Sequence, residues 1–327
     1  MLKEIVELVR NYEGLRRKKP ISSILEELIP VENIGRTVWG FGEDCAVIDH
    51  EGSYLLLAAE SIWPKLLEDP KWAGYCSILV NVNDIYAMGG RPIAAVNTLS
   101  FRDENEGRLL ARGMRKGSRM FKVPIVGGHI QPESDSPSIS LCILGSAKNP
   151  VSSFGCRAGD DVIAAIDLNG KMKSRFLNFD STSGKSSKDV LFQLEAFVKI
   201  ADERLASAAK DISNPGVLGS IAMLLETSKV GAEIDVGKIP KPEEVDMNDW
   251  FLAYPGCGFI VTSASTKSEE VLRILRSRNL SATIVGQATH ERKMRISFDG
   301  ESRVLFDLEN EIITGAVSTR ASGARDG

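Results

Sequence analysis

Hydrophobic and polar positions along the first half of the chain follow a pattern that mixes strands with helices. Apolar runs over 45–49 and 53–59 flank the turn residues 50–52, which predicts a β-hairpin. Residues 71–88 form a helical pattern rich in apolar positions, and Gly89-Gly90 would end this helix. Further elements predicted here are two short helices within 5–29, strands over 93–100, 123–126 and 139–145, and an amphipathic helix over 104–122.

The second half has the same mixture of elements after a seam near residue 150, where Lys148-Asn149-Pro150 predicts a linker. The Ser- and Gly-rich segment 180–189 predicts a mobile loop, and a long amphipathic helix is expected over 190–209. Other predicted elements are strands over 161–166, 232–235, 259–262, 283–286 and 293–298, and helices over 217–228 and 268–278. We therefore predict an α+β fold with domains over 1–150 and 151–317, followed by a disordered tail over 318–327.

The composition narrows the class of protein. Lys and Arg total 40 against 44 Asp and Glu, so no basic excess favours a nucleic-acid partner. The N-terminal segment carries charges among its apolar residues, and no apolar run reaches the roughly 18 residues that span a bilayer. We expect a cytoplasmic protein with no nucleic-acid or membrane partner. The basic turn over 16–20 is expected to be solvated.

The 5 cysteines are scattered without a C-x-x-C pair, and the 3 histidines lie far apart in the sequence. This spacing lacks the clustering typical of zinc sites. The cysteines are therefore expected to be small buried hydrophobic residues.

Two acidic residues are predicted to meet at one end of the hairpin. With a turn centred on Glu51, Asp44 pairs roughly opposite Ala59, which adjoins Glu60. Closely packed carboxylates repel one another, and a divalent cation with oxygen ligands would relieve that repulsion. The alternative interpretation is a solvated strand end that carries ordinary surface acids.

The predicted helix over 71–88 places Asn81, Asn83 and Asp84 among apolar neighbours. A buried aspartate in a helix needs a cation or a hydrogen-bond network, because an unpaired buried polar group is costly. The alternative is a helix whose polar residues face solvent.

Two further segments indicate ligand contact. Gly127-Gly128-His129 ends a predicted strand, where paired glycines let the backbone approach a ligand closely, although Gly-Gly is also a common turn. Asn214 suits the N-cap of the helix that follows, and Pro215 suits its first position. Capping does not explain Asp211, which could face a metal and its bound anion near the helix N-terminus.

One apparent phosphate-binding motif does not support a phosphate site. Ser183-Gly184-Lys185-Ser186 matches the end of a phosphate-binding loop, but Phe179 stands where that motif requires glycine. No predicted strand leads into it, so we interpret it as a Ser-rich loop.

These segments, in this order and spacing, resemble the PurM-like (aminoimidazole-ribonucleotide, or AIR, synthetase-related) superfamily. Its members include thiamine-monophosphate kinase, selenophosphate synthetase and hydrogenase maturation protein E. The matching motifs are GEDCAVI at 42–48, AES at 59–61, LVNVNDIYAMGGRP at 79–92, VGGH at 126–129, DISNPG at 211–216 and GAEID at 231–235. Segments 72–76, 211–216 and 254–256 are most similar to the AIR synthase-related proteins known as methanogenesis marker protein 2.

The resemblance implies a PurM-like two-domain fold whose N-terminal sheet joins that of a second subunit, forming a β-barrel across a homodimer. ATP would bind at this interface, with Mg²⁺ bridging its phosphates to the acidic residues. The implied metal ligands are Asp44, Glu60, Asp84 and Asp211. The implied nucleotide-binding residues are Ser61, Asn81, Asn83, Gly127, Gly128, His129 and Asn214.

The sequence also departs from the superfamily pattern. Glu43 and Glu60 replace aspartates, His129 replaces the aspartate of the kinases, and Asn214 replaces an aspartate of some members. No cysteine precedes Cys45, which argues against selenophosphate synthetase activity, and the tail lacks the cysteine of hydrogenase maturation protein E. Segment 254–258 replaces an acidic turn of thiamine-monophosphate kinase.

Two functions remain open from the sequence. The first is Mg-ATP-dependent phosphotransfer to a small-molecule substrate, or its activation as a phosphate, achieved mainly by positioning and charge neutralisation. The second is a nucleotide-binding accessory protein with a degenerate metal site and no turnover. The aspartates favour the first function and the replacements favour the second. No catalytic base can be assigned.

Overall fold

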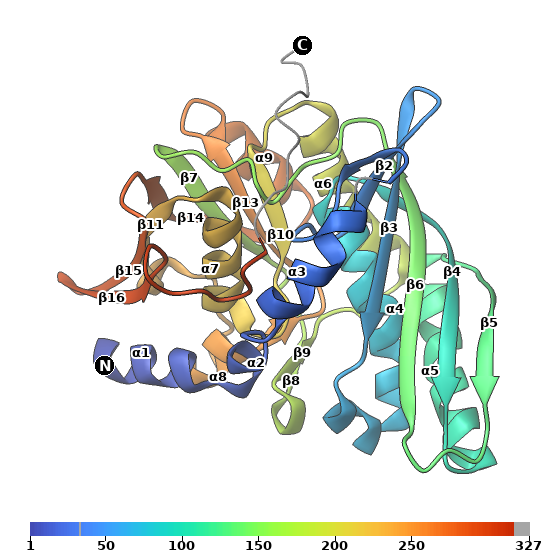
Figure 1. The fold of residues 1–327 in the computed structure, drawn as a ribbon. Helices are drawn as coiled ribbons and strands as arrows, with labels where there is room; N and C mark the ends of the chain where they lie inside the picture. Colours follow the sequence, from blue (N-terminus) through green and yellow to red (C-terminus); the bar gives the residue numbers. More distant parts are fainter. Residues whose placement is uncertain (33, 317–327) are drawn as a thin grey trace.

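Two large β-sheets and the helices packed on them make up the computed structural model, which describes residues 1–32 and 34–316 (Figure 1). The first sheet comes from the first half of the chain and the second from the second half. This arrangement confirms the predicted α+β class. The tail predicted over 318–327 lies outside the described residues.

The first sheet has 6 strands in the order β1-β2-β3-β6-β4-β5. Its strands are β1 (Thr37–Trp39), β2 (Ala46–His50), β3 (Ser53–Ser61), β4 (Arg91–Ser100), β5 (Ile125–Gln131) and β6 (Ser138–Ala147). Strands β2 and β3 form the predicted hairpin, in which His50 pairs with Ser53. Glu51 and Gly52 have φ angles of 47° and 84°, the left-handed backbone that a two-residue hairpin turn requires.

Helices α4 (Pro70–Ala87) and α5 (Glu104–Phe121) pack against each other beside this sheet. Glycines bring their backbones together. A Cβ atom on Gly74 would lie 2.1 Å from the carbonyl oxygen of Leu110, and one on Gly113 would lie 2.0 Å from that of Lys71. Helix α4 also contacts β3 and β6, and nearly all of its residues are buried. Its position relative to the sheet is therefore tightly fixed.

Strands of the first sheet also carry exposed apolar side chains. Leu57 on β3 is 40% exposed and Val96 on β4 is 41% exposed. The other exposed large apolar residues of this sheet are Val38, Ile93, Val126 and Ile130. Strand β5 forms the outer edge (Figure 1). Such a gathering of exposed apolar side chains is typical of an interaction surface.

The second sheet has 7 strands in the order β10-β13-β7-β14-β11-β15-β16. Its strands are β7 (Asp160–Ile166), β10 (Ala208–Asp211), β11 (Gly231–Asp235), β13 (Gly258–Ala264), β14 (Ser281–Thr289), β15 (Lys293–Phe298) and β16 (Glu301–Asp307). Strand β7 is buried at every position, and alternate residues along it join two different cores. Ile163 belongs to the core shared with the first half, whereas Val162 belongs to a second core.

The helices of the second half cover the second sheet and the junction between the halves. They are α6 (Ser187–Asp202), α7 (Gly216–Ser228), α8 (Met247–Leu252) and α9 (Ser268–Ser277). A small third sheet joins β8 (Lys171–Lys173), β9 (Asn178–Asp180) and β12 (Tyr254–Pro255). Among the described residues, no helix combines the length and apolar character needed to cross a membrane.

The N-terminal helix α1 (Leu2–Asn11) packs with the second half of the chain. Its residues Leu2, Ile5 and Val9 are buried in the second core, and Arg10 pairs with Glu311. Helices α2 (Glu13–Arg16) and α3 (Ile21–Glu32) then lead back toward the first sheet (Figure 1). The domain division near residue 150 stays a prediction, and α1 is packed across it.

Two predicted elements differ from the structure. The helix expected over 190–209 ends at Asp202, because Arg204 takes a left-handed φ of 52° and Ala208–Asp211 pairs with β13 as strand β10. Sheet pairing here overrides the helical preference of an alanine-containing run. The segment 180–189, predicted to be a mobile loop, is packed at its start, where Ser181 and Thr182 are buried, and its last residues belong to α6. Asp180 accepts hydrogen bonds from the following backbone and so holds the turn.

The glycine contact between α4 and α5 can be tested by whether Gly→Ala substitutions raise or lower the free energy of unfolding. In an exposed helix, Gly→Ala stabilises by about 1 kcal/mol. Here the added methyl group would meet backbone oxygen atoms, so we expect Gly74→Ala and Gly113→Ala each to lower the free energy of unfolding by ~1–3 kcal/mol in urea denaturation.

The matched control is Gly184→Ala, because no heavy atom of the part of the chain that the structure describes, Gly184 and its two chain neighbours aside, lies within 4 Å of the position that its added Cβ atom would take. We expect this variant to be as stable as the parent or up to ~1 kcal/mol more stable. Stability of both helix variants equal to this control would contradict the packing.

Candidate functional site

A cavity of about 420 Å³ lies at the junction of the two halves. Helices α3 and α4, the end of β3, the segment before β2 and the end of β10 all contribute to its wall. The cavity brings together seven of the residues predicted for the site: Asp44, Glu60, Ser61, Asn83, Asp84, Asp211 and Asn214.

Three aspartates from three separate elements meet in this wall. Asp44 precedes β2, Asp84 lies in α4, and Asp211 ends β10. One carboxylate oxygen of each lies within 4.8 Å of the others. The side chains of Asp44 and Asp211 are only 2% and 5% exposed, and Asp84 is also buried. The hairpin, the glycine-packed helix and the strand pairing of β10 therefore converge on one carboxylate cluster.

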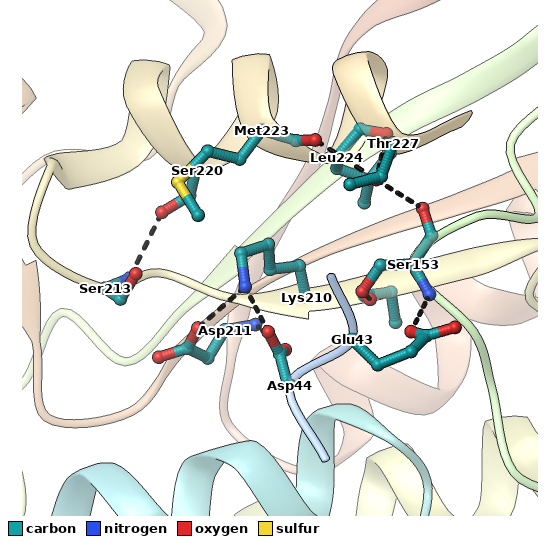
Figure 2. Close-up of polar contacts among 11 residues, drawn as sticks. Glu43, Asp44, Ser153, Lys210, Asp211, Ser213, Ser220, Met223, Leu224 and Thr227 are labelled. Atoms are coloured by element: carbon teal, nitrogen blue, oxygen red, sulfur yellow. Dashed lines mark hydrogen bonds and ion pairs between the residues drawn. The ribbon is translucent and has the colours of Figure 1, made fainter. Parts of the chain in front are cut away.

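Lys210 supplies a positive charge between two of these aspartates (Figure 2). Its ammonium group forms an ion pair with Asp44 and lies 3.7 Å from a carboxylate oxygen of Asp211. The backbone N–H of Asp211 also donates to Asp44, at 3.1 Å. Burial opposes the charge on Lys210, but Asp44 and Asp211 outweigh it, so the pKa of this ammonium is raised. Asp44 is thus well compensated.

Asp84 lacks this compensation. Among the described residues, its Oδ2 atom is buried without a hydrogen-bond partner, and so is the Oδ1 atom of Asn83. Burial, then the charges of Asp211 and Glu60, raise the pKa of Asp84 well above its usual range. Burial and the charge of Asp44 likewise raise the pKa of Asp211 to about 7. An ionised Asp84 is therefore costly unless a cation binds beside it.

The donor set fits a hard divalent cation such as Mg²⁺. Such ions prefer carboxylate and carbonyl oxygen ligands. Asp44, Asp84 and Asp211 offer mutually close carboxylate oxygens, and Asn83 adds an unpaired amide oxygen next to Asp84. Among the described residues, the unpartnered Asn83 oxygen is evidence for such a ligand that is independent of the acidic cluster itself.

Glu43, which adjoins Asp44 in sequence, turns to a different partner. Its carboxylate accepts a hydrogen bond from the Ser153 backbone N–H at 2.6 Å (Figure 2). It also accepts one from the Ser152 hydroxyl. Burial raises the pKa of Glu43 to about 7 despite these hydrogen bonds. Glu43 therefore holds the segment that connects the two halves against the residues before β2.

The basic turn contributes to the cavity, contrary to the expectation that it is only solvated. Arg17 and Lys18 line the cavity, and Lys18 is half-buried. Burial and the nearby Lys210 lower the pKa of the Lys18 ammonium. Glu60 and Ser61, at the end of β3, line the same cavity, although Glu60 is not among the three mutually close carboxylates.

Asn214 does not cap a helix as predicted. Helix α7 begins at Gly216 after the N-cap Pro215, and within the described part of the chain no side-chain hydrogen bond caps its start. Neither polar atom of the Asn214 side chain has a hydrogen-bond partner among the described residues, and the side chain lines the cavity. Asn81 is buried in α4 and donates to the Ser77 carbonyl at 2.9 Å, away from the cavity lining.

The glycine pair and His129 lie apart from the cavity. Strand β5 was predicted to end at 126 but continues to Gln131, so Gly127, Gly128 and His129 are within it and exposed. Pairing with β4 extends the strand, since Asn97 lies opposite Gly128. Within one chain, the structure does not bring these three residues to the aspartates.

The sequence did not identify Lys210, Lys18 or the aromatic part of the wall. Lys210 could not be predicted as a site residue, because the sequence pattern of Ala208–Asp211 is that of a helix end. A lysine beside a candidate metal ligand in a buried strand is the signal that would have found it. Trp72 and Tyr254 also line the cavity, and the Trp72 indole donates to Asn178 at 2.9 Å.

Comparisons with known proteins agree with this architecture. Residues 42–147 match the family described as AIR synthase related protein, N-terminal domain, and residues 159–299 match its C-terminal domain. The chain is 42% identical over 322 residues to the uncharacterized protein MJ0640 of Methanocaldococcus jannaschii, covering 96% of this chain and 99% of that protein. It is 26% identical over 220 residues to thiamine-monophosphate kinase of Rhodopirellula baltica, covering 62% of this chain and 66% of the kinase.

A solved structure shares the fold. Thermotoga maritima PurL complexed with ATP superposes with a TM-score of 0.71 at 19% identity. The match covers 84% of this chain but 48% of the PurL chain, so this chain spans about half the length of PurL. On the two domain matches and the shared fold, the chain belongs to the AIR synthase-related family of the PurM-like superfamily.

Proposed function

We propose that the protein binds Mg-ATP in the cavity and transfers a phosphoryl group to a small-molecule substrate, or activates that substrate as a phosphate. The observation that carries this proposal is the buried cluster of Asp44, Asp84 and Asp211, in which an Asp84 oxygen has no hydrogen-bond partner within residues 1–32 and 34–316. The kinase relative and the ATP complex of PurL support the choice of nucleotide.

Each group in the wall has a role in this proposal. The three aspartates and Asn83 would hold Mg²⁺, which neutralises phosphate charge when bound. Lys18, Ser61 and Asn214 would contact nucleotide or substrate, because their polar groups line the cavity. Glu60 would act through the outer coordination of the ion. No residue near the aspartates is assigned as a general base.

A homodimer would complete the site. The exposed apolar residues of the first sheet, including Leu57 and Val96, are suited to contact a second copy of the sheet. Joining two such sheets into a barrel would cover these side chains. It would also let the glycine pair and His129 of one subunit approach the cavity of its partner, where Gly127 and Gly128 would contact phosphates. This arrangement accounts for their separation from the aspartates within one chain.

The alternative is a nucleotide-binding accessory protein without turnover. Lys210 favours it, because its ammonium engages Asp44 and Asp211 and competes with metal ligation. Steady-state ATP hydrolysis across candidate acceptors separates the two functions. Turnover with any acceptor, lost in Asp84→Asn, supports phosphotransfer, whereas nucleotide binding with no turnover across the acceptors supports the accessory role.

Asp84→Asn tests the metal-ligand assignment. The substitution removes a charge but keeps the shape of the side chain. We expect the nucleotide-free variant to be as stable as the parent or more stable, because a repelled buried carboxylate is relieved. A Mg²⁺ complex of a non-hydrolysable ATP analogue at 100 times its Kd should stabilise the parent by about 2.7 kcal/mol and the variant far less.

Thermal melts with and without the analogue measure both effects. Asp49→Asn, on the exposed part of β2, is the control and should respond to the ligand like the parent. A structural aspartate gives the opposite pair of results, namely a loss of ~1–3 kcal/mol in the free protein and a normal ligand response. A parental ligand response in Asp84→Asn would end the assignment.

The homodimer predicts a mass of twice 35.6 kDa in multi-angle light scattering. Val96→Glu should yield a monomer without unfolding it, because this side chain is exposed within one chain. Val304→Glu, at an exposed apolar position on β16, should remain dimeric. A monomeric parent at micromolar concentration would contradict the dimer.

A further inference from the structure

Lys210 has a geometry that the proposed metal site alone does not explain. Its ammonium group lies between Asp44 and Asp211, two of the three carboxylates that would hold the ion (Figure 2). The lysine side chain is 9% exposed, and it also lines the cavity. A buried lysine that served only to pair one aspartate would not need to reach two candidate ligands at once.

The charges in the cluster are incompletely balanced. If all three carboxylates are ionised, as metal binding requires, they leave with the one ammonium group two negative charges, which one divalent cation would balance. The oxygen left without a partner belongs to Asp84, the member that Lys210 does not contact. Lys210 thus neutralises part of the negative charge that a metal ion would neutralise. It leaves the carboxylate of Asp84 without a cation beside it.

We propose that Lys210 is a built-in cation that keeps free metal out of the nucleotide-free site and shifts to the phosphates when the metal enters with the nucleotide. This inference rests on the proposed function, because it concerns the same site. A divalent ion on these aspartates would lie close to the ammonium group, and like charges repel strongly where water is excluded. Phosphate oxygens offer the ammonium group new acceptors.

The lysine side chain is suited to this exchange. Its four-carbon stem is flexible, and its ammonium group is a compact point charge. The guanidinium group of an arginine is instead planar, with its donors in a fixed geometry. Lys18, whose ammonium repels that of Lys210, and Glu60, whose carboxylate attracts it, also lie near, and the cationic Arg17 lines the same cavity. Movement of Lys210 toward the cavity would free Asp44 and Asp211 to coordinate the ion. Lys210 is in this sense a positioning residue that couples metal binding to nucleotide binding.

Electron paramagnetic resonance titration with Mn²⁺ tests the inference, since it measures metal affinity with and without a non-hydrolysable ATP analogue. We expect the parent to bind Mn²⁺ weakly alone and tightly with the analogue. Lys210→Gln should bind Mn²⁺ alone at least ~10-fold more tightly than the parent does, because the competing charge is gone. Lys210→Arg keeps the charge and should still resist free Mn²⁺. A lysine with a merely structural role predicts weaker metal binding in Lys210→Gln.

Lys185→Gln is the matched control, because Lys185 forms an ion pair with buried Asp167 outside the cavity lining. It should bind Mn²⁺ like the parent. Equal affinity of parent and Lys210→Gln for free Mn²⁺ would overturn the inference and leave the proposed function intact. Failure of the parent to bind Mn²⁺ with the analogue would overturn both. If Lys210→Gln does not fold, the parent alone still tests the inference. Equal affinity of the parent for Mn²⁺ with and without the analogue would then overturn it.

Discussion

The crowding of Asp44, Asp84 and Asp211 in a buried wall is the interaction on which this structure depends. Three carboxylates whose oxygens approach within 4.8 Å repel one another, and burial denies them the screening of water. The fold tolerates this because Lys210 and a backbone N–H compensate Asp44, while the pKa values of Asp84 and Asp211 are raised. The repulsion within this cluster lowers the stability of the metal-free protein, and a bound cation would restore that stability.

The surrounding architecture holds these groups in place. Helix α4 is pressed against α5 through glycines, so Asp84 cannot easily withdraw. Strand β10 is paired along its length with β13, which fixes Lys210 and Asp211. Glu43 ties the segment before β2 to the connection between the halves, and Asp44 follows directly. Electrostatic strain and rigid support therefore occur at the same point, as expected of a preorganised binding site.

The sequence predicted the parts of this site that have local signals. The hairpin turn, the polar residues within an apolar helix and the segment 211–216 were each identifiable, and the cavity places Asp44, Asp84 and Asp211 together. What depended on long-range packing was not identifiable. Ala208–Asp211 has no strand pattern of its own and becomes β10 only by pairing with β13, so Lys210 was missed. Asn214 has the residue type of a cap, but the backbone at Gly216, with φ 79°, starts the helix later.

The central claim is that the three aspartates bind the metal of a metal–nucleotide complex. The most direct measurement is anomalous diffraction from crystals grown with Mn²⁺ and a non-hydrolysable ATP analogue. The account predicts an anomalous peak within coordination distance of Asp84 Oδ2, with the nucleotide phosphates beside it in the cavity. Nucleotide bound elsewhere, or bound in the cavity with no peak at Asp84, would contradict it.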